Sequence, residues 1–129
     1  MKSIDEIREF FKNDRFATEA GAVIDEVGDG YAKCSLKIND GHRNALGGVM
    51  GGVSFTLADF AFAVAANHEQ VCTVSLCSNI TFIGAAKGES LTATAKCVKD
   101  GRSTCYYTVS VSDELGNKIA ELSVTGFKR

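Results

Sequence analysis

Hydrophobic and polar residues alternate through most of the second half of the chain. Alternation with a period of two is typical of β-strands that bury one face. Short clusters of glycine and charged residues separate the alternating stretches, and two of them, Asp100-Gly101 and Gly116-Asn117, are typical of tight hairpin turns. We therefore predict four strands, at residues 71–83, 90–99, 103–112 and 118–127.

The first half of the chain predicts a helix and a hairpin. Ser3 and Glu6 have the spacing of a capping box, and a stripe of apolar residues follows, so we expect a helix that ends near Asn13. Residues 22–27 and 31–38 have the pattern of two strands joined by a glycine-containing turn.

A long helix is predicted at residues 51–67, and it is apolar on every side. Residues 50–66 carry one charge, Asp59. A helix without a polar face has to be covered all round, which a curled sheet would achieve. The sequence therefore predicts an α+β fold in which a curved antiparallel sheet wraps a long central helix. We reject the competing transmembrane interpretation, because the segment is short, begins with two glycines and carries a central carboxylate.

Length and composition indicate one globular domain, which we take to span residues 1–129. The formal net charge is −2 and the 14 basic residues are spread along the chain, so no nucleic-acid partner is expected. The N-terminal residues lack the apolar stretch of a secretory signal, and we expect a cytoplasmic protein that does not bind membranes. The five cysteines contain no CxxC pair, so we interpret them as small buried hydrophobic residues and expect no metal or redox cofactor.

Asp59 is the main candidate for chemistry. Its helical neighbours Phe55, Phe62 and Ala63 offer no partner for a carboxylate. Burial there is expected to raise its pKa towards the range of a base or a nucleophile. The alternative is that the helix begins at Asp59, which would then be its N-cap. The residues alone leave both interpretations open.

Four glycines, Gly47, Gly48, Gly51 and Gly52, precede the helix. Amides of a first helical turn have no acceptor within the helix and could stabilise an oxyanion, although an ordinary flexible loop has the same composition. If Gly51 begins the helix, Asp59 lies about 12 Å further along it, too far for both to contact one carbonyl group. A site that uses both residues has to be shared between two copies of the chain.

Other catalytic schemes have less support. The GxSxG motif is absent, and a Ser-His-Asp or Cys-His site would have to recruit His42 or His68, which have no suggestive neighbours. Ser75, Cys77 and Asn79 are expected to share one half-polar face of a strand.

Three segments carry a resemblance to a known family. They read HRNALGGVMGG at residues 42–52, LAD at 57–59 and SLCSNITF at 75–82. Together they resemble the hotdog-fold acyl-CoA thioesterases of the phenylacetate-pathway (PaaI-like) type, within the 4-hydroxybenzoyl-CoA thioesterase superfamily. The pattern of that family is H-x-N-x-x-G-x-x-H-G-G, followed by L-x-D inside the long helix.

The resemblance implies a thioesterase that hydrolyses an acyl-CoA to a free carboxylic acid and coenzyme A. By this resemblance Asp59 is the nucleophile or general base, the Gly51 amide polarises the thioester carbonyl, and Asn44 and Ser75 assist. The family also places Asp59 and Gly51 of one site on opposite subunits, so we expect a homodimer at least, and a homotetramer. No cofactor is expected, because coenzyme A is part of the substrate.

The chain departs from the family pattern at Met50, where the family has histidine. We expect His42, Met50 and Gly52 to contact the substrate, but a thioether cannot donate the hydrogen bond of an imidazole. This departure leaves open the alternative that the protein is a module that binds acyl-CoA or another small ligand without turnover. A hydratase or dehydratase on the same fold would need a histidine, and only His42 could serve.

Overall fold

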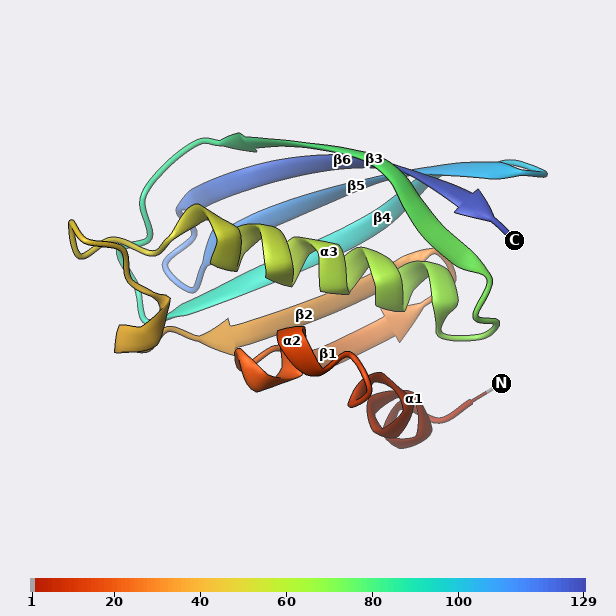
Figure 1. The fold of residues 1–129 in the computed structure, drawn as a ribbon, viewed down its shortest axis with the longest axis horizontal. Helices are drawn as coiled ribbons and strands as arrows, with labels where there is room; N and C mark the ends of the chain where they lie inside the picture. The colour runs from red at the N-terminus through yellow and green to blue at the C-terminus, as the bar shows by residue number, and fades with distance from the viewer. Residues whose placement is uncertain (1) are drawn as a thin grey trace.

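One antiparallel sheet of six strands curves around a long helix (Figure 1). The computed structural model describes residues 2–129. The strand order is β1-β2-β4-β5-β6-β3. The strands are β1 (Val23–Gly28), β2 (Tyr31–Lys37), β3 (Thr73–Phe82), β4 (Ser90–Asp100), β5 (Thr104–Asp113) and β6 (Lys118–Lys128). The predicted strands are confirmed to within two residues at each end.

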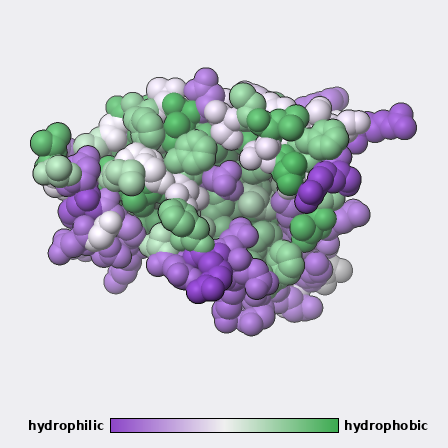
Figure 2. Space-filling model, viewed as in Figure 1, coloured by the Kyte–Doolittle hydropathy of each residue, from purple (hydrophilic) through white to green (hydrophobic). Residues whose placement is uncertain are grey.

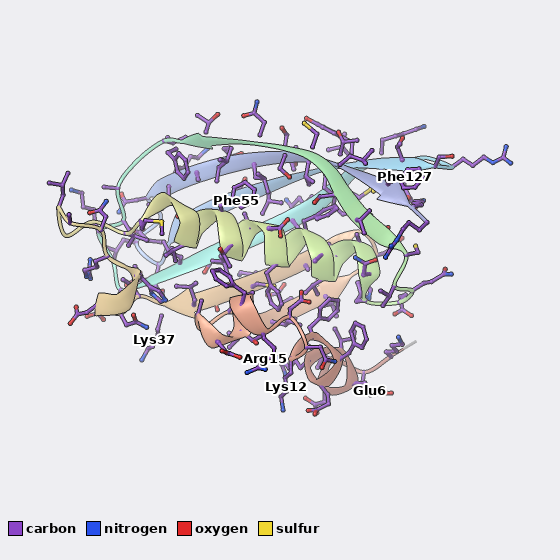
Figure 3. All side chains as sticks on the ribbon, viewed as in Figure 1. Glu6, Lys12, Arg15, Lys37, Phe55 and Phe127 are labelled. Carbon is purple, nitrogen blue, oxygen red and sulfur yellow. The ribbon has the colours of Figure 1, made fainter. Side chains whose placement is uncertain are left out.

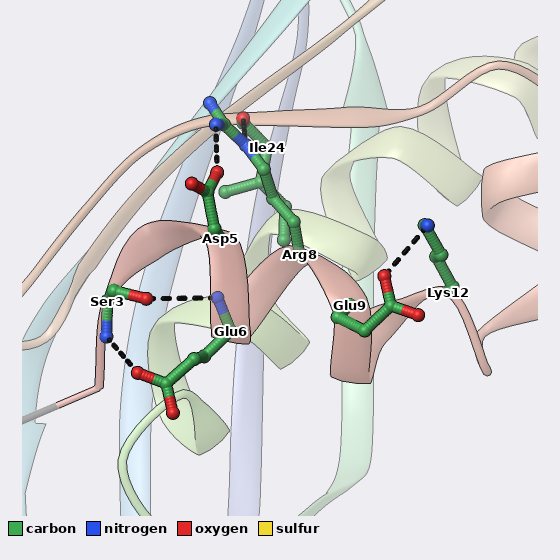
Figure 4. Close-up of polar contacts among 7 residues, drawn as sticks. All are labelled: Ser3, Asp5, Glu6, Arg8, Glu9, Lys12 and Ile24. Carbon is green, nitrogen blue, oxygen red and sulfur yellow. Dashed lines mark hydrogen bonds and ion pairs between the residues drawn. The ribbon is translucent and has the colours of Figure 1, made fainter.

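The helices are α1 (Ile4–Phe11), α2 (Arg15–Glu19), a 3-10 turn η1 (Asp40–His42) and α3 (Gly51–Asn67). The bounds predicted for α3 are confirmed. The capping box is confirmed as well: the Glu6 amide donates to Ser3 Oγ at 3.2 Å, and the Ser3 amide donates to Glu6 Oε1 at 3.1 Å (Figure 4). The short helix α2 was not predicted, because five residues are too few to show a helical period.

The core lies between α3 and the inner face of the sheet. Leu57, Ala58, Ala61 and Val64 of α3 are fully buried there, against small and branched residues of β2, β4, β5 and β6. We expected α3 to be buried on all sides, but within one chain it is buried only on the sides that the sheet covers. A stripe on the opposite side stays half-exposed, because one sheet cannot close around the helix; it consists of Phe55, Thr56, Asp59, Ala63 and Ala66.

A β-bulge in β3 overturns the prediction that Ser75 and Cys77 share a face. Ser75 pairs with the buried Gly126, whereas Cys77 pairs with Thr125 on the outer side of the sheet. The extra residue, Leu76, changes the alternation, so Ser75 lies on the side of α3 and Cys77 on the other. The alternation in the sequence carries no sign of this extra residue.

All five cysteines are free, but they are not all buried as predicted. Cys34 and Cys105 are buried and Cys77 is exposed on β3, while Cys72 and Cys97 are intermediate. Burial raises the pKa of the Cys34 thiol to about 12. Among the helices of residues 2–129, none combines the length and the hydropathy needed to cross a membrane.

The connection from β3 to β4 is held by the carboxylate of Asp113. Its oxygens accept backbone hydrogen bonds from Lys87, Gly88, Leu115 and Asn117 at 2.8–3.1 Å, and a further one from Asn117 Nδ2 at 3.0 Å. The side-chain bond from Asn117 and the backbone bonds hold the pKa of Asp113 well below its usual range. The turn predicted at Asp113 to Gly116 therefore has a second role: its Asp113 carboxylate also holds the segment that follows β3.

We expect Asp113→Asn to lower the Tm at pH 7 by several degrees, because one carboxylate oxygen that accepts hydrogen bonds becomes an NH₂ group that faces N–H donors and cannot accept from them. A depressed folded-state pKa contributes stability above the unfolded value of about 3.9, and this contribution is lost as the pH falls below it. The difference in Tm between wild type and variant should therefore narrow between pH 5 and pH 2. Thermal denaturation followed by circular dichroism checks this, and equal Tm values at pH 7 would contradict it.

Candidate active site

Asp59 lies near the middle of α3, so it is not the N-cap of a shorter helix. Its side chain is half-buried in the uncovered stripe and makes no hydrogen bond or ion pair with the described residues. Burial raises the pKa of this carboxyl above its ordinary value, and the negative charge of Asp14 raises it further. The rise predicted from the sequence is thus present, with a second cause that the sequence did not indicate.

A pocket of about 490 Å³ opens beside Asp59, between α2 and α3. Phe55 and Thr56 line it from α3, one turn before Asp59, and Asp14 and Phe16 line it at the start of α2. Figure 3 labels Phe55 on α3 and Arg15 on α2, the two helices that border this pocket. Spacing along a helix could have predicted Phe55 and Thr56. Nothing in the sequence links Asp14 or Phe16 to Asp59, because that contact depends on how α2 packs.

The loop before α3 is organised by Asn44. Its Oδ1 accepts hydrogen bonds from the amides of Leu46 at 3.0 Å and Gly48 at 3.1 Å. Gly47 has a φ of +88°, a conformation that favours glycine. The Asn44 backbone N–H donates to the Gly48 carbonyl oxygen at 2.7 Å, whereas its side-chain Nδ2 has no acceptor among residues 2–129 and remains available to donate. The oxygen of Asn44 therefore shapes the loop, while its amino group can face a ligand.

The Gly51 amide has no acceptor in the part of the chain that the structure describes, as expected for the first residue of α3. The next amide, that of Gly52, donates to Met50 Sδ at 3.0 Å. Phe82, at the end of β3, packs directly on Gly51: a Cβ at this position would lie 2.8 Å from the aromatic ring. The loop thus presents the free Gly51 N–H beside an aromatic ring.

His42 is buried and anchors this loop. The Asn39 amide donates to His42 Nδ1 at 3.1 Å, so Nε2 carries the proton and donates to the Ala20 carbonyl oxygen at 2.7 Å. Both ring nitrogens are therefore occupied within the chain. This arrangement leaves none for the substrate contact expected of His42, or for the acid–base role that a hydratase would require.

Ser75 is exposed on the α3 side of β3 and pairs with Gly126, where an added Cβ would lie 3.1 Å from the Phe62 ring of α3. Its hydroxyl makes no hydrogen bond with any residue in the described range.

Met50 is half-exposed and Gly52 is exposed at the start of α3. In residues 2–129, no group of three or more His, Cys, Asp or Glu side chains is placed to hold a metal ion. Within one chain, the structure brings Met50, Gly51 and Gly52 together but leaves Asp59 two turns away along α3.

Residues 46–120, which include Gly51, Asp59 and most of the sheet, match the family model described as "Thioesterase superfamily". The chain belongs to the thioesterase superfamily. A protein of Archaeoglobus fulgidus named "Putative esterase" is 34% identical over 119 residues, which are 91% of this chain and 77% of that protein. Acyl-coenzyme A thioesterase PaaI of Escherichia coli K12 is 29% identical over 115 residues, 85% of this chain and 79% of PaaI.

Two solved structures are similar to this chain. The E. coli PaaI structure superposes with a TM-score of 0.89 over 98% of this chain and 96% of that chain; at 24% identity it shows the fold, a hotdog fold. A hypothetical thioesterase protein of Streptococcus pneumoniae TIGR4, in its structure with coenzyme A, has a TM-score of 0.84 and 26% identity, covering 92% of this chain and 96% of that one. The thioesterase-superfamily chain is thus a thioester hydrolase by its family.

We expect Gly51→Ala to reduce the rate of thioester hydrolysis by roughly 10²-fold or more, the loss typical of removing an oxyanion donor. The new methyl group would collide with the Phe82 ring and displace the free amide. Gly48→Ala is the matched control, because a Cβ there meets only Asn44, at 3.9 Å. Steady-state kinetics of both variants check this, and equal rates would contradict the role of the Gly51 amide. Adding Phe82→Leu to Gly51→Ala should restore part of the rate.

Proposed function

We propose that this protein is an acyl-CoA thioesterase whose catalytic carboxylate is Asp59 and whose oxyanion donor is the Gly51 amide. The observation that carries the proposal is the half-buried Asp59 carboxylate, which has no partner among the described residues. An uncompensated carboxylate in an apolar helix costs stability, and such groups concentrate at functional sites. The coenzyme A in the structure of the S. pneumoniae relative and the name of E. coli PaaI support acyl-CoA as the substrate class.

The chemistry requires one base or nucleophile and one donor to the carbonyl oxygen. Asp59 either takes a proton from water as the water oxygen attacks the thioester carbon, or attacks that carbon itself to form an anhydride that water then cleaves. The Gly51 amide, at the positive end of α3, stabilises the negative charge that develops on the carbonyl oxygen. The C–S bond then breaks, and coenzyme A leaves as a thiolate that takes up a proton.

Two copies of the chain are needed, because Gly51 and Asp59 of one α3 are about 12 Å apart along the helix axis. The sheet supplies a contact surface for the second copy. Strand β3 pairs with β6 on one side only, so its other edge is free, and Leu76 and Phe82 on it are exposed. A long free edge with apolar side chains favours pairing with another strand. We therefore infer a homodimer at least, which joins the two sheets at β3, and expect two dimers to form a homotetramer.

The surface around α3 supports this arrangement. Figure 2 shows apolar residues gathered over α3 and β3, with hydrophilic residues around them. Leu46, in the loop before α3, is 96% exposed in the single chain, and Met50 is half-exposed. Contiguous exposed apolar surface of this kind marks contact with a partner or ligand. Asp59 would then lie inside the dimer, opposite the partner's loop.

Met50 supports the enzyme over a module that binds without turnover. Its Sδ takes the amide of Gly52, as the side chain of an N-cap residue does. The loop therefore keeps its shape without the histidine of the family pattern. Since this bond leaves the adjacent Gly51 amide free, the donor that the chemistry needs is still present.

Asp59→Asn should reduce kcat by about 10³-fold, because an amide can neither accept the proton nor attack the thioester. The measurement is release of free thiol from a panel of acyl-CoAs, with binding of coenzyme A followed by calorimetry. Binding should be retained, since the substitution changes one atom of the side chain. Wild type that binds acyl-CoA tightly without releasing thiol would support the binding module instead.

Mixing chains tests whether the site is shared. Asp59→Asn and Gly51→Ala are each expected to be nearly inactive, but random assembly of the two should recover about a quarter of wild-type activity. Half of the dimers are then mixed, and each mixed dimer contains one intact site. Native mass spectrometry verifies that mixed dimers form. Mixed dimers without activity would show that both groups act within one chain.

A further inference from the structure

Asp14 has the position of a helix cap but does not act as one. It precedes α2 as the N-cap residue, yet its side chain accepts no hydrogen bond from the first turn of that helix. An aspartate at an N-cap ordinarily accepts such a bond, which satisfies one of the free amides. The Asp14 carbonyl oxygen accepts the first bond of the helix, from the Thr18 amide at 3.0 Å, while the Asp14 side chain takes no part. The Asp14 carboxylate also forms no ion pair with residues 2–129.

The Asp14 carboxylate shares a pocket with the Asp59 carboxylate. Both line the same cavity of about 490 Å³, together with Phe16 and Phe55. Asp59 is half-buried in this pocket and Asp14 lies at its exposed rim, and partial burial raises the pKa of Asp14 as well as that of Asp59. Two like charges in one partly apolar pocket disfavour each other's ionised state. The sequence places these residues 45 positions apart, and the packing of α2 on α3 brings them together.

We propose that Asp14 is a positioning residue of the active site, whose carboxylate acts through its charge on Asp59 of the same chain across the pocket that both residues line. This inference rests on the proposed function, in which Asp59 is the catalytic carboxylate. Helix α2, which supplies neither the Gly51 amide nor the Asp59 carboxylate, thereby has a role in the active site.

The other charged and titratable groups around α3 do not cancel this effect. Arg15 lines the pocket, but its side chain is 80% exposed and its Nε donates to Glu19 Oε2 at 2.7 Å. From the sheet, the titratable groups that face α3 are Cys34, Cys97, Cys105, Tyr107 and Asp113. Burial raises the pKa of Cys34, Cys105 and Tyr107, so these groups are neutral near pH 7. The Asp113 carboxylate is enclosed by its own donors at the end of β5.

A stronger base transfers a proton faster, but it is ionised only at higher pH. Removal of the Asp14 charge should therefore have opposite effects at the two ends of the pH range. At the low-pH end of the rate profile, a larger fraction of Asp59 is ionised in the variant than in wild type, so the variant hydrolyses the thioester faster. On the plateau Asp59 is ionised in both proteins, and the variant is slower because its Asp59 is the weaker base. Loss of structure cannot produce such crossed profiles, because it lowers the rate at every pH.

The experiment compares the pH dependence of kcat and kcat/KM in wild type and in Asp14→Asn. We expect the acidic limb to move to lower pH, the plateau kcat to fall about threefold, and KM to change little. Asp14→Glu keeps the charge and should return the limb towards its wild-type position. Asp29→Asn is the matched control, since it removes the same charge from the turn between β1 and β2, outside the active-site pocket.

A second measurement does not depend on turnover. The carboxyl carbon signal of Asp59, identified by its absence in Asp59→Asn, is titrated by NMR in wild type and in Asp14→Asn. We expect its midpoint to move to lower pH in Asp14→Asn and to stay in place in Asp29→Asn. If wild type hydrolyses no thioester, the proposed function fails, while the NMR titration still decides the effect of Asp14. An unchanged midpoint, or a rate lowered equally at every pH, would overturn the inference.

Discussion

The structure depends on an apolar helix that its own sheet covers on one side only. The buried face of α3 consists of residues such as Leu57, Ala61 and Val64, which pack against the inner sides of the strands and hold the domain together. The opposite face has no cover within the chain, and it contains the one charge of the helix, Asp59. Burial by a second copy would make that charge more costly still. The same packing that stabilises the domain therefore also sets the environment of the carboxylate.

Around this helix, short polar contacts fix the groups that a thioester would meet. Asn44 closes the loop with its oxygen, His42 ties the loop to the end of α2, and Met50 caps the first turn. Phe82 occupies the space that a side chain at Gly51 would need. None of these contacts is strong by itself, since single hydrogen bonds contribute about 1 kcal/mol. Together they hold one amide at the helix terminus without an acceptor.

The sequence predicts well what depends on local pattern. The apolar run at residues 50–66, with Asp59 as its one charge, predicts α3 and its carboxylate, and the spacing of Ser3 and Glu6 predicts the first cap. Period-two alternation gives all six strands. Features that depend on contacts between distant segments escape prediction. The bond from His42 to Ala20 spans 22 residues, and the approach of Asp14 to Asp59 requires a helix, α2, too short to show a period.

The bulge at Leu76 divides the free edge of β3 into two parts. Before it, the strand is short and changes direction; after it, residues 77–82 pair regularly with β6 up to Phe82. A strand added at this edge would find an even row of backbone donors and acceptors only along the second part. In the proposed dimer, the bulge would limit how far the two sheets can slide past each other. Because Phe82 ends that row and contacts Gly51, the same limit would set the position along β3 at which the Gly51 amide of one chain faces its partner.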